Sequence, residues 1–330
     1  MVVTPKITIG IVTHNCLKYT KLFLKYLRLN ADIPYQLIVI DNHSTDGTVD
    51  YLSLQKDLLL VANKRNYGFA YANNQAFSRS QAPLFLGVNN DTVIFPRFLS
   101  RLVAYVEKHP TYSQFGVYSN CIAALNPYTR QPIDKEIKQS FEESVSPANI
   151  VKQYYGDMNQ FSQKFAQSNP GIQILETPPH FTGGWCFLVR AQEVKQVGGL
   201  FDTRFKIGFW EDVDLSWRLA KIGKIVHLNN LYIHHFTHIS FKNNKLKKSD
   251  HAISRANALR FAEKWSQDIR SFFKSKFSQG LTLKDITEQY FIFKAYFGSE
   301  DDLGDKESKL KSEFINSKIG FKDFLVSSKE

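Results

Sequence analysis

Short apolar segments alternate with helical segments between residues 7 and 88, and this alternation constrains the fold more than any other feature of the chain. Apolar, β-rich segments cover residues 7–13, 36–41, 58–62 and 84–88, and helical patterns cover residues 17–30 and 70–79. Strands and helices that alternate at this spacing build a mostly parallel sheet with helices on both faces. The sequence therefore predicts an α/β fold with a Rossmann-like central sheet.

Polar side chains gather where the predicted strands end. Thr13 and Asn15 follow the first strand, Asp41 ends the second, and Asn89 and Asp91 follow the fourth. An open α/β sheet binds its ligands at the carboxyl ends of its strands, so these residues predict a site. A turn and a helix cap also explain the residues that follow Asp41, so a structural role and a binding role stay open for that carboxylate.

Three acidic residues, Glu211, Asp212 and Asp214, fall within four positions. Acids in the first turn of a helix stabilise it, which is a structural explanation for the cluster. Asp214 and Arg218 stand four residues apart and are spaced to pair on one helix face. That pairing leaves Glu211 or Asp212 to face a site as a base, as the deprotonation of an attacking hydroxyl requires.

Asp91 and a histidine cluster are the candidate ligands of a cation. Mg²⁺ and Mn²⁺ are often held by one or two carboxylates, so that substrate oxygens fill the other positions. His234, His235 and His238 lie close together after an apolar segment, and neutral imidazole binds transition metals. A single histidine is more often structural than a ligand, and these three lack the spacing of a zinc site.

The chain has 330 residues and a formal net charge of +11, which favours anionic partners. Much of the positive charge lies in residues 242–277. A solvated helical face explains this segment, and so does contact with an anionic membrane surface. Nucleic acid is disfavoured because no known binding module surrounds it. Three distant cysteines and only a short apolar run near the N-terminus predict a cytoplasmic location without a membrane-spanning segment.

We divide the chain into a domain of residues 1–242 and a basic, helical C-terminal extension of residues 243–330. Residues 126–179 are rich in proline, glutamine, asparagine and serine, and predict an irregular insertion that shapes access of an acceptor. Residues 252–277 predict one helix. The charged tail after Ser299 predicts partial disorder.

Several short motifs occur in order through residues 5–242. They are Val12-Thr13-His14-Asn15, Asp41-Asn42-His43-Ser44-Thr45-Asp46-Gly47-Thr48, Asn66-Tyr67-Gly68-Phe69, Asn89-Asn90-Asp91, Gly183-Gly184, Trp210-Glu211-Asp212-Val213-Asp214 and His235. As an ordered set they resemble glycosyltransferase family 2, whose members are inverting enzymes with a GT-A fold. Within that family the chain is similar to the rhamnosyltransferase-like branch of bacterial glycan enzymes.

The resemblance implies a role for each matching residue. Asp212 would be the general base, with Glu211 as its neighbour and less favoured substitute. Asp91 would bind a divalent metal ion, Mn²⁺ or Mg²⁺, and His235 would be a second ligand of the metal or the diphosphate. Asn89 departs from the family's Asp-x-Asp pattern and leaves one carboxylate for the metal. The residues that would contact the nucleotide-sugar donor are Thr13, Asn15, Asp41, Asn66, Asn89 and Trp185.

The implied reaction moves a sugar from a nucleotide-diphosphate sugar to a hydroxyl of a glycan, lipid-linked or protein acceptor, in the assembly of bacterial surface glycans. The implied location is the cytoplasm, with peripheral contact at the inner face of the membrane and no nucleic acid partner. Two other classes stay open. One is a non-catalytic GT-A module that binds sugar nucleotides or glycans, for which Asn89 argues. The other is a sugar-1-phosphate nucleotidyltransferase, which the lack of a Gly-rich phosphate loop disfavours.

Overall fold

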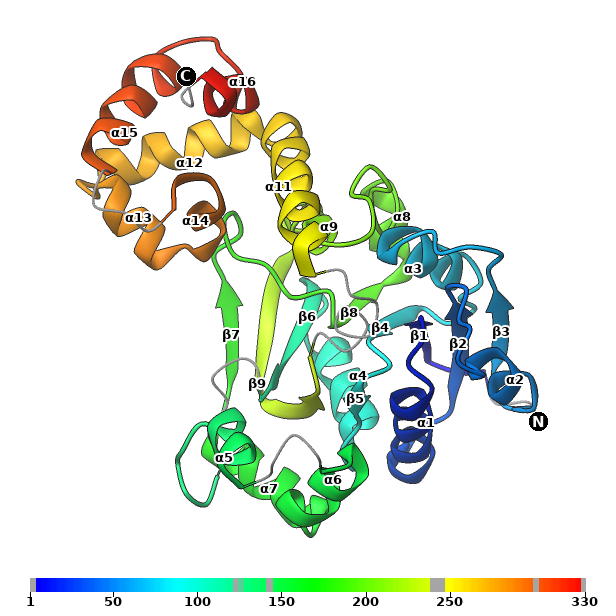
Figure 1. Cartoon of the computed structure of the whole chain (residues 1–330). Coiled ribbons are helices and arrows are strands. Elements are labelled where there is room, and N and C mark those ends of the chain that lie inside the picture. Colours follow the sequence, from blue (N-terminus) through cyan, green and yellow to red (C-terminus); the bar gives the residue numbers. More distant parts are fainter. Residues whose placement is uncertain are drawn as a thin grey trace.

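A nine-stranded sheet forms the centre of the described part of the chain (Figure 1). The computed structural model describes residues 4–120, 125, 127–140, 145–237, 247–298 and 303–327. The strand order is β3-β2-β1-β4-β8-β6-β9-β5, and β7 also pairs with β9. The strands are β1 (Ile7–Thr13), β2 (Tyr35–Asp41), β3 (Leu59–Ala62), β4 (Leu84–Val88), β5 (Thr92–Val93), β6 (Tyr112–Ser119), β7 (Ile172–Leu175), β8 (Cys186–Arg190) and β9 (Lys224–His235).

The first four strands are parallel to one another, as the strand–helix alternation predicts. Strand β6 is parallel to β9, whereas β5, β7 and β8 run antiparallel to their partners. In the parallel register Thr13 at the end of β1 lies beside Asp41 at the end of β2. The carboxyl ends of β1, β2 and β4 therefore bring the predicted polar residues to one edge of the sheet.

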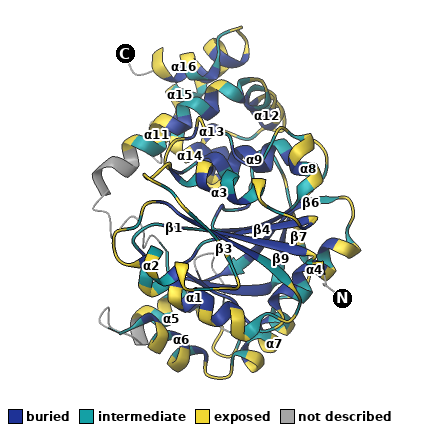
Figure 2. Cartoon of the chain, turned by 90° about the vertical axis from the view of Figure 1, so that its right-hand side faces the viewer, coloured by how far each residue is buried: buried dark blue, intermediate teal, exposed yellow. Residues whose placement is uncertain are grey.

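The sheet separates two apolar cores, because alternate residues of each strand point to opposite faces. Ile7, Ile9 and Ile11 pack on one face with apolar residues of α1 and α4. Ile38 and Ile40 pack on the other face with α3, α8 and α9. Figure 2 shows the buried strands between these helical layers. The helices that accompany the strands are α1 (Leu17–Asn30), α2 (Thr48–Ser53), α3 (Phe69–Ser78), α4 (Phe98–Lys108), α8 (Ala191–Gln196) and α9 (Glu211–Leu219).

The prediction that residues 126–179 are irregular is wrong for their described part, which contains α5 (Ile133–Ser140), α6 (Pro147–Tyr155), α7 (Met158–Ser168) and β7. Local caps start the last two of these helices. The Ser146 hydroxyl accepts from the backbone N–H of Asn149, and the Asp157 carboxylate caps α7 in the same way. Apolar residues of α6 and α7 then pack against strand β9 in one buried cluster: Val151, Tyr155, Phe161, Phe165 and Tyr232.

The C-terminal region is helical, as predicted, but it differs from the prediction in two places. The single helix expected over 252–277 is two helices, because the chain leaves helical geometry at Trp265. The tail expected to be partly disordered is packed: Phe314, Phe321 and Phe324 are at most 2% exposed. The helices are α11 (Lys247–Lys264), α12 (Ser266–Ser278), α13 (Leu283–Gln289), α14 (Phe291–Phe297), α15 (Leu303–Lys309), the π-helical turn η1 (Leu310–Ile315) and α16 (Phe321–Ser327).

These C-terminal helices pack on α9 and on the loop before it. Trp210, Val213 and Trp217 share one buried apolar cluster with Phe261 and Trp265 of the extension. The expected boundary between residues 242 and 243 lies outside the described residues, as do Cys121 and His238, so the two-part division stays a prediction. None of the described helices is both long and apolar enough to cross a membrane.

Candidate functional site

The nucleoside side of the predicted site is a network of buried side chains at the ends of β1 and β2. Asp41 is fully buried, and its Oδ1 atom accepts from the Ser44 N–H at 2.8 Å. Its Oδ2 atom is buried and accepts no hydrogen bond from the described residues. An unpaired buried carboxylate oxygen is costly unless a ligand satisfies it. Asp41 therefore has a free acceptor with which to bind a donor group of a ligand.

Thr13 and Asn15 use their side chains to hold neighbouring loops. The Thr13 hydroxyl lies 3.1 Å from the Thr20 hydroxyl and accepts from Asn90 Nδ2 at 3.1 Å. The Asn15 side-chain oxygen accepts from the Thr45 N–H at 2.7 Å. These contacts fix the strand ends, so both residues shape the predicted donor pocket whether or not they touch the donor itself.

Asn66 belongs to a network of amides that fixes the loop before α3. Its Oδ1 atom accepts from Asn42 Nδ2 at 2.8 Å and from the Gly68 N–H at 2.9 Å. Asn42 in turn accepts from the Tyr67 N–H at 3.1 Å. The sequence reasoning missed Asn42 as a site residue, although it is 2% exposed and links the Asp41 strand to the Asn66 loop.

Asp91 and His235 meet although they are far apart in the sequence. Oδ1 of Asp91 lies 3.2 Å from Nε2 of His235, and both residues are buried. Nδ2 of Asn89 lies 3.4 Å from the same imidazole nitrogen. Trp185 stacks on the His235 ring at 5.1 Å between ring centroids, and its carbonyl accepts from the Asn89 N–H at 2.8 Å. The predicted metal residues and two predicted donor contacts thus form one cluster.

Asn120 fixes the position of His235, a role that the sequence reasoning missed. Its side chain donates to the His235 carbonyl at 3.0 Å and accepts from the His235 N–H at 2.8 Å. Such a two-way amide contact holds the backbone of one residue in register. No sequence signal pointed to Asn120, because strand β6, which it follows, was not predicted.

Glu211 and Asp212 begin helix α9, and their environments separate their protonation states. Backbone N–H groups of Gly184 and Val213 each donate to Asp212 at 2.9 Å. Burial raises the pKa of Asp212, and these donors oppose the rise. Burial, and then the charge of Asp212, raise the pKa of Glu211 well above its ordinary value. Of the two acids, Asp212 has the hydrogen-bond donors that stabilise a carboxylate, so it is the better placed to carry the negative charge.

Gly184 connects the acidic pair with the Asp91 cluster. Its N–H binds Asp212, and the next residue, Trp185, stacks on His235. A Cβ atom at Gly184 would lie 3.3 Å from Cβ of Asp212, so the backbone of this loop passes close to the carboxylate. The predicted base and the predicted cation ligands therefore lie on one continuous set of contacts.

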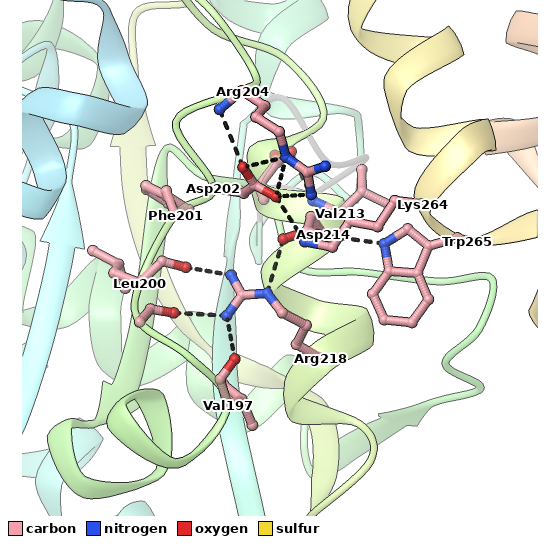
Figure 3. Close-up of polar contacts among 12 residues, drawn as sticks. Val197, Leu200, Phe201, Asp202, Arg204, Val213, Asp214, Arg218, Lys264 and Trp265 are labelled. Atoms are coloured by element: carbon pink, nitrogen blue, oxygen red, sulfur yellow. Dashed lines mark hydrogen bonds and ion pairs between the residues drawn. The ribbon is translucent and has the colours of Figure 1, made fainter.

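The third acid of the motif, Asp214, has a structural role. Its Oδ2 atom accepts from Arg218 Nε at 2.8 Å, which confirms the predicted pair. Its Oδ1 atom lies 2.6 Å from Lys264 Nζ and accepts from Trp265 Nε1 at 2.9 Å (Figure 3). Asp214 thus ties α9 to the C-terminal helix α11, and it is unavailable as a base.

The side chains around Asp91 show whether this cluster could hold a cation. Oδ1 of Asp91 is buried, and Nε2 of His235 approaches it to 3.2 Å. The described residues contain no group of three or more histidine, cysteine or acidic side chains arranged to hold a metal. One carboxylate and one imidazole fit a divalent ion that takes its remaining ligands from substrate oxygens and water. The residues present therefore fit Mn²⁺ or Mg²⁺ held jointly with a diphosphate.

Comparison with known proteins assigns the chain to a family. Residues 8–169 match the sequence model described as glycosyl transferase family 2. The N-acetylglucosaminyl-diphospho-decaprenol L-rhamnosyltransferase of Mycobacterium tuberculosis is 26% identical over 229 residues, which are 64% of this chain and 69% of the relative. EpsE of Bacillus subtilis is 28% identical over 117 residues, 34% of this chain. That match covers 42% of EpsE, less than half of its length.

Solved structures share the fold at low sequence identity. The mannosyltransferase PcManGT from Pyrobaculum calidifontis, in complex with GDP-Man and Mn²⁺, has a TM-score of 0.51 and 16% identity. The match covers 82% of this chain and 65% of the PcManGT chain. Residues 1–349 of Staphylococcus aureus TarS give a TM-score of 0.50 and 15% identity over 98% of this chain and 91% of that structure. These likenesses confirm the predicted GT-A fold. Residues 8–169 thus belong to glycosyltransferase family 2, a family of transferase enzymes.

Proposed function

We propose that this protein transfers a sugar from a nucleotide-diphosphate sugar to an acceptor hydroxyl with inversion at the anomeric carbon. One observation carries the proposal: the half-buried Asp212 carboxylate, which accepts two backbone N–H groups, stands on the same continuous set of contacts as Asp91 and His235. A base for the acceptor and ligands for a diphosphate-bound cation are the two requirements of this reaction.

In the proposed reaction, Asp212 accepts the proton of the acceptor hydroxyl. The hydroxyl oxygen forms a bond to the anomeric carbon from one face, and the bond to the diphosphate breaks on the opposite face. Asp91 and His235 would hold a divalent ion that neutralises charge on the departing diphosphate. Glu211 stays protonated beside Asp212, so that a single negative charge faces the acceptor.

The donor would lie between the Asp41 carboxylate and the Asp91 cluster. The free Oδ2 atom of Asp41 is suited to a base or ribose donor group, and the amide network at Asn66 would shape the nucleotide pocket. Trp185 is fixed by its stack on His235, so its indole edge would border the diphosphate or the sugar. Thr13, Asn15 and Asn89 would support these contacts.

The relatives support a proposal for the acceptor and the pathway. One relative is named for a rhamnosyl transfer to a diphospho-decaprenol-linked sugar. We accordingly propose a glycan, lipid-linked or protein acceptor in bacterial surface glycan assembly, on the cytoplasmic side.

Peripheral membrane contact rests on fewer residues than the charge of the C-terminal region suggests. Lys264 binds Asp202 and Asp214, Lys276 binds Glu176, Arg270 donates to carbonyls of the C-terminal tail, and Arg260 donates to Asn257. These cations are used inside the fold. Among the described basic residues of this segment, Arg255 and Lys274 are exposed and could face an anionic surface.

The membrane proposal predicts that the protein co-sediments with liposomes that contain anionic lipid at low salt, and not with neutral liposomes. Binding that is equal for both kinds of liposome, or no binding, would contradict it.

A screen of nucleotide sugars tests the main proposal. Donor turnover should require Mn²⁺ or Mg²⁺ with at least one nucleotide sugar, and Asp212→Asn should lose it while still binding nucleoside diphosphate. Glu211→Gln is the matched control, because it removes the adjacent acid that is already uncharged. Binding without turnover in the wild-type protein would favour a non-catalytic module, and pyrophosphate release from a nucleoside triphosphate and sugar-1-phosphate would favour a nucleotidyltransferase.

A further inference from the structure

The loop before the acidic pair has an unfavourable backbone conformation. Ile207, Phe209 and Trp210 have φ values of 68°, 74° and 76°, in the left-handed region that side chains with a Cβ atom disfavour. Strain of this kind persists only where the surrounding contacts over-determine the conformation. The loop leads directly into Glu211 and Asp212, so the contacts that hold the loop also fix the position of the first residues of α9.

One side chain from the C-terminal region holds this loop. Nδ2 of Asn257 lies 3.1 Å from the Lys206 carbonyl oxygen, 2.8 Å from that of Gly208 and 3.2 Å from that of Phe209. Asn257 is fully buried in α11, so its amide has no access to water. Its two N–H bonds are shared among these three backbone carbonyl groups. Without Asn257, the carbonyl groups would need other hydrogen-bond donors in the protein interior.

A second contact fixes the direction of the Asn257 amide. Nη1 of Arg260 donates to the side-chain oxygen of Asn257 at 2.8 Å. The amide nitrogen therefore faces the loop and the oxygen faces the guanidinium. An aspartate at this position would place a carboxylate against three carbonyl oxygens, which repel it.

The opposite side of the loop touches the predicted nucleotide pocket. The Phe69 N–H donates to the Ile207 carbonyl at 2.7 Å. A Cβ atom at Gly68 would lie 2.8 Å from the Ile207 nitrogen, so the two loops are in close backbone contact. The strained loop 206–210 is thus clamped between residues 68–69, which follow Asn66, and Asn257 of the extension.

We propose that Asn257 is a positioning residue for the base: it holds loop 206–210 so that Asp212 faces the acceptor hydroxyl. This inference rests on the proposed transfer reaction, and it gives the C-terminal helical region a part in catalysis. Asn257 touches neither substrate nor Asp212, and it acts through the backbone that carries the acidic pair. Figure 1 shows α11 beside α9, where this contact is made.

Asn257→Asp is the main test, since it keeps the shape of the side chain and removes its donors. Tyr296→Phe is the matched control: it removes a hydrogen bond of 2.9 Å to the Ala258 carbonyl of α11 and keeps the aromatic ring that packs on Trp210 of the loop. We expect kcat to fall about 10- to 100-fold in Asn257→Asp at temperatures where it is folded, the scale of a misplaced catalytic group. The dissociation constant of nucleoside diphosphate should change less, because the Asn42–Asn66 network holds the loop before α3 without help from Asn257. Tyr296→Phe should keep the wild-type kcat.

Hydrogen exchange gives a readout that does not depend on activity. Backbone amides of residues 207–214 should exchange faster in Asn257→Asp and not in Tyr296→Phe. Arg260→Gln is a milder change, because it only frees the Asn257 amide to rotate. It should also speed exchange and lower kcat, but by less than Asn257→Asp. This variant keeps the test available if Asn257→Asp does not fold.

Unchanged exchange in this segment would overturn the claim that Asn257 holds the loop. Faster exchange with an unchanged kcat would overturn the catalytic part of the inference and leave a purely structural contact. A wild-type protein that turns over no donor would overturn the proposed function instead, and the exchange result would still decide whether Asn257 holds the loop.

Discussion

Replacing Asp214 with alanine should destabilise the protein strongly, because the carboxylate is the centre of a buried ion cluster. Asp214 is fully buried and binds Arg218 at 2.8 Å, Lys264 at 2.6 Å and Trp265 at 2.9 Å. Removing one partner of a buried ion pair costs about 3–5 kcal/mol, since the other charge is left uncompensated.

The remaining contacts of the two cations place the expected loss at the lower end of that range. Arg218 keeps its hydrogen bonds to backbone carbonyls of the loop that follows α8, including 2.6 Å to Gly199 (Figure 3). Lys264 keeps Asp202 at 2.9 Å and is 23% exposed. We therefore expect Asp214→Ala to lower the free energy of unfolding by about 3 kcal/mol.

Urea denaturation at neutral pH, followed by fluorescence of the buried tryptophans, measures this loss. Asp214→Asn should cost less, because its side-chain oxygen still accepts from Trp265. Asp50→Ala, at an exposed acid in the first turn of α2, is the control and should change stability by less than about 0.5 kcal/mol. A loss below about 1 kcal/mol in Asp214→Ala would refute the reasoning, since a surface ion pair contributes no more than that.

Three further changes test separate parts of the structure. Burial raises the pKa of Glu211, so the wild type loses stability as pH rises above the unfolded value; Glu211→Gln should raise Tm at pH 8 and have little effect at pH 4. Burial alone would raise the pKa of Asp202, but the cations that bind it lower the pKa on balance; Asp202→Asn should therefore destabilise at pH 7, and thermal melts should show the difference beginning to shrink as pH falls below about 4. Gly68 has φ 86° and ψ 169°, and a Cβ atom there would clash with Ile207; Gly68→Ala should cost at least about 1–3 kcal/mol in urea denaturation, and unchanged stability would contradict the close contact.

The sequence predicts those parts of the protein that depend on local periodicity and on strand ends. The parallel strands and their polar ends follow from apolar runs that stop at Thr13, Asp41 and Asn89. The Asp214–Arg218 pair follows from helical spacing. The proximity of Asp91 and His235 was predicted only through the family resemblance, because no local pattern relates two residues so far apart in the chain.

Other features were missed because their signals are weak or lie far away in the sequence. Helices α6 and α7 begin at caps formed by Ser146 and Asp157, and these two residues do not stand out among the many polar residues of the segment. Trp265 breaks one long helical pattern because its indole N–H binds Asp214 in another element. Asn257 gave no sequence signal, since its importance comes from three carbonyl groups of a distant loop.

The central claim is that the loops bearing Asp91 and His235 bind one cation together with a diphosphate, on the same side as Asp212. Crystals grown with Mn²⁺ and a nucleoside diphosphate, measured at the manganese absorption edge, locate that ion directly. The account predicts one anomalous peak at a coordination distance of about 2–2.5 Å from the Asp91 carboxylate and from His235, and its loss in Asp91→Ala. A peak bound elsewhere on the protein, or one that persists in Asp91→Ala, would contradict it.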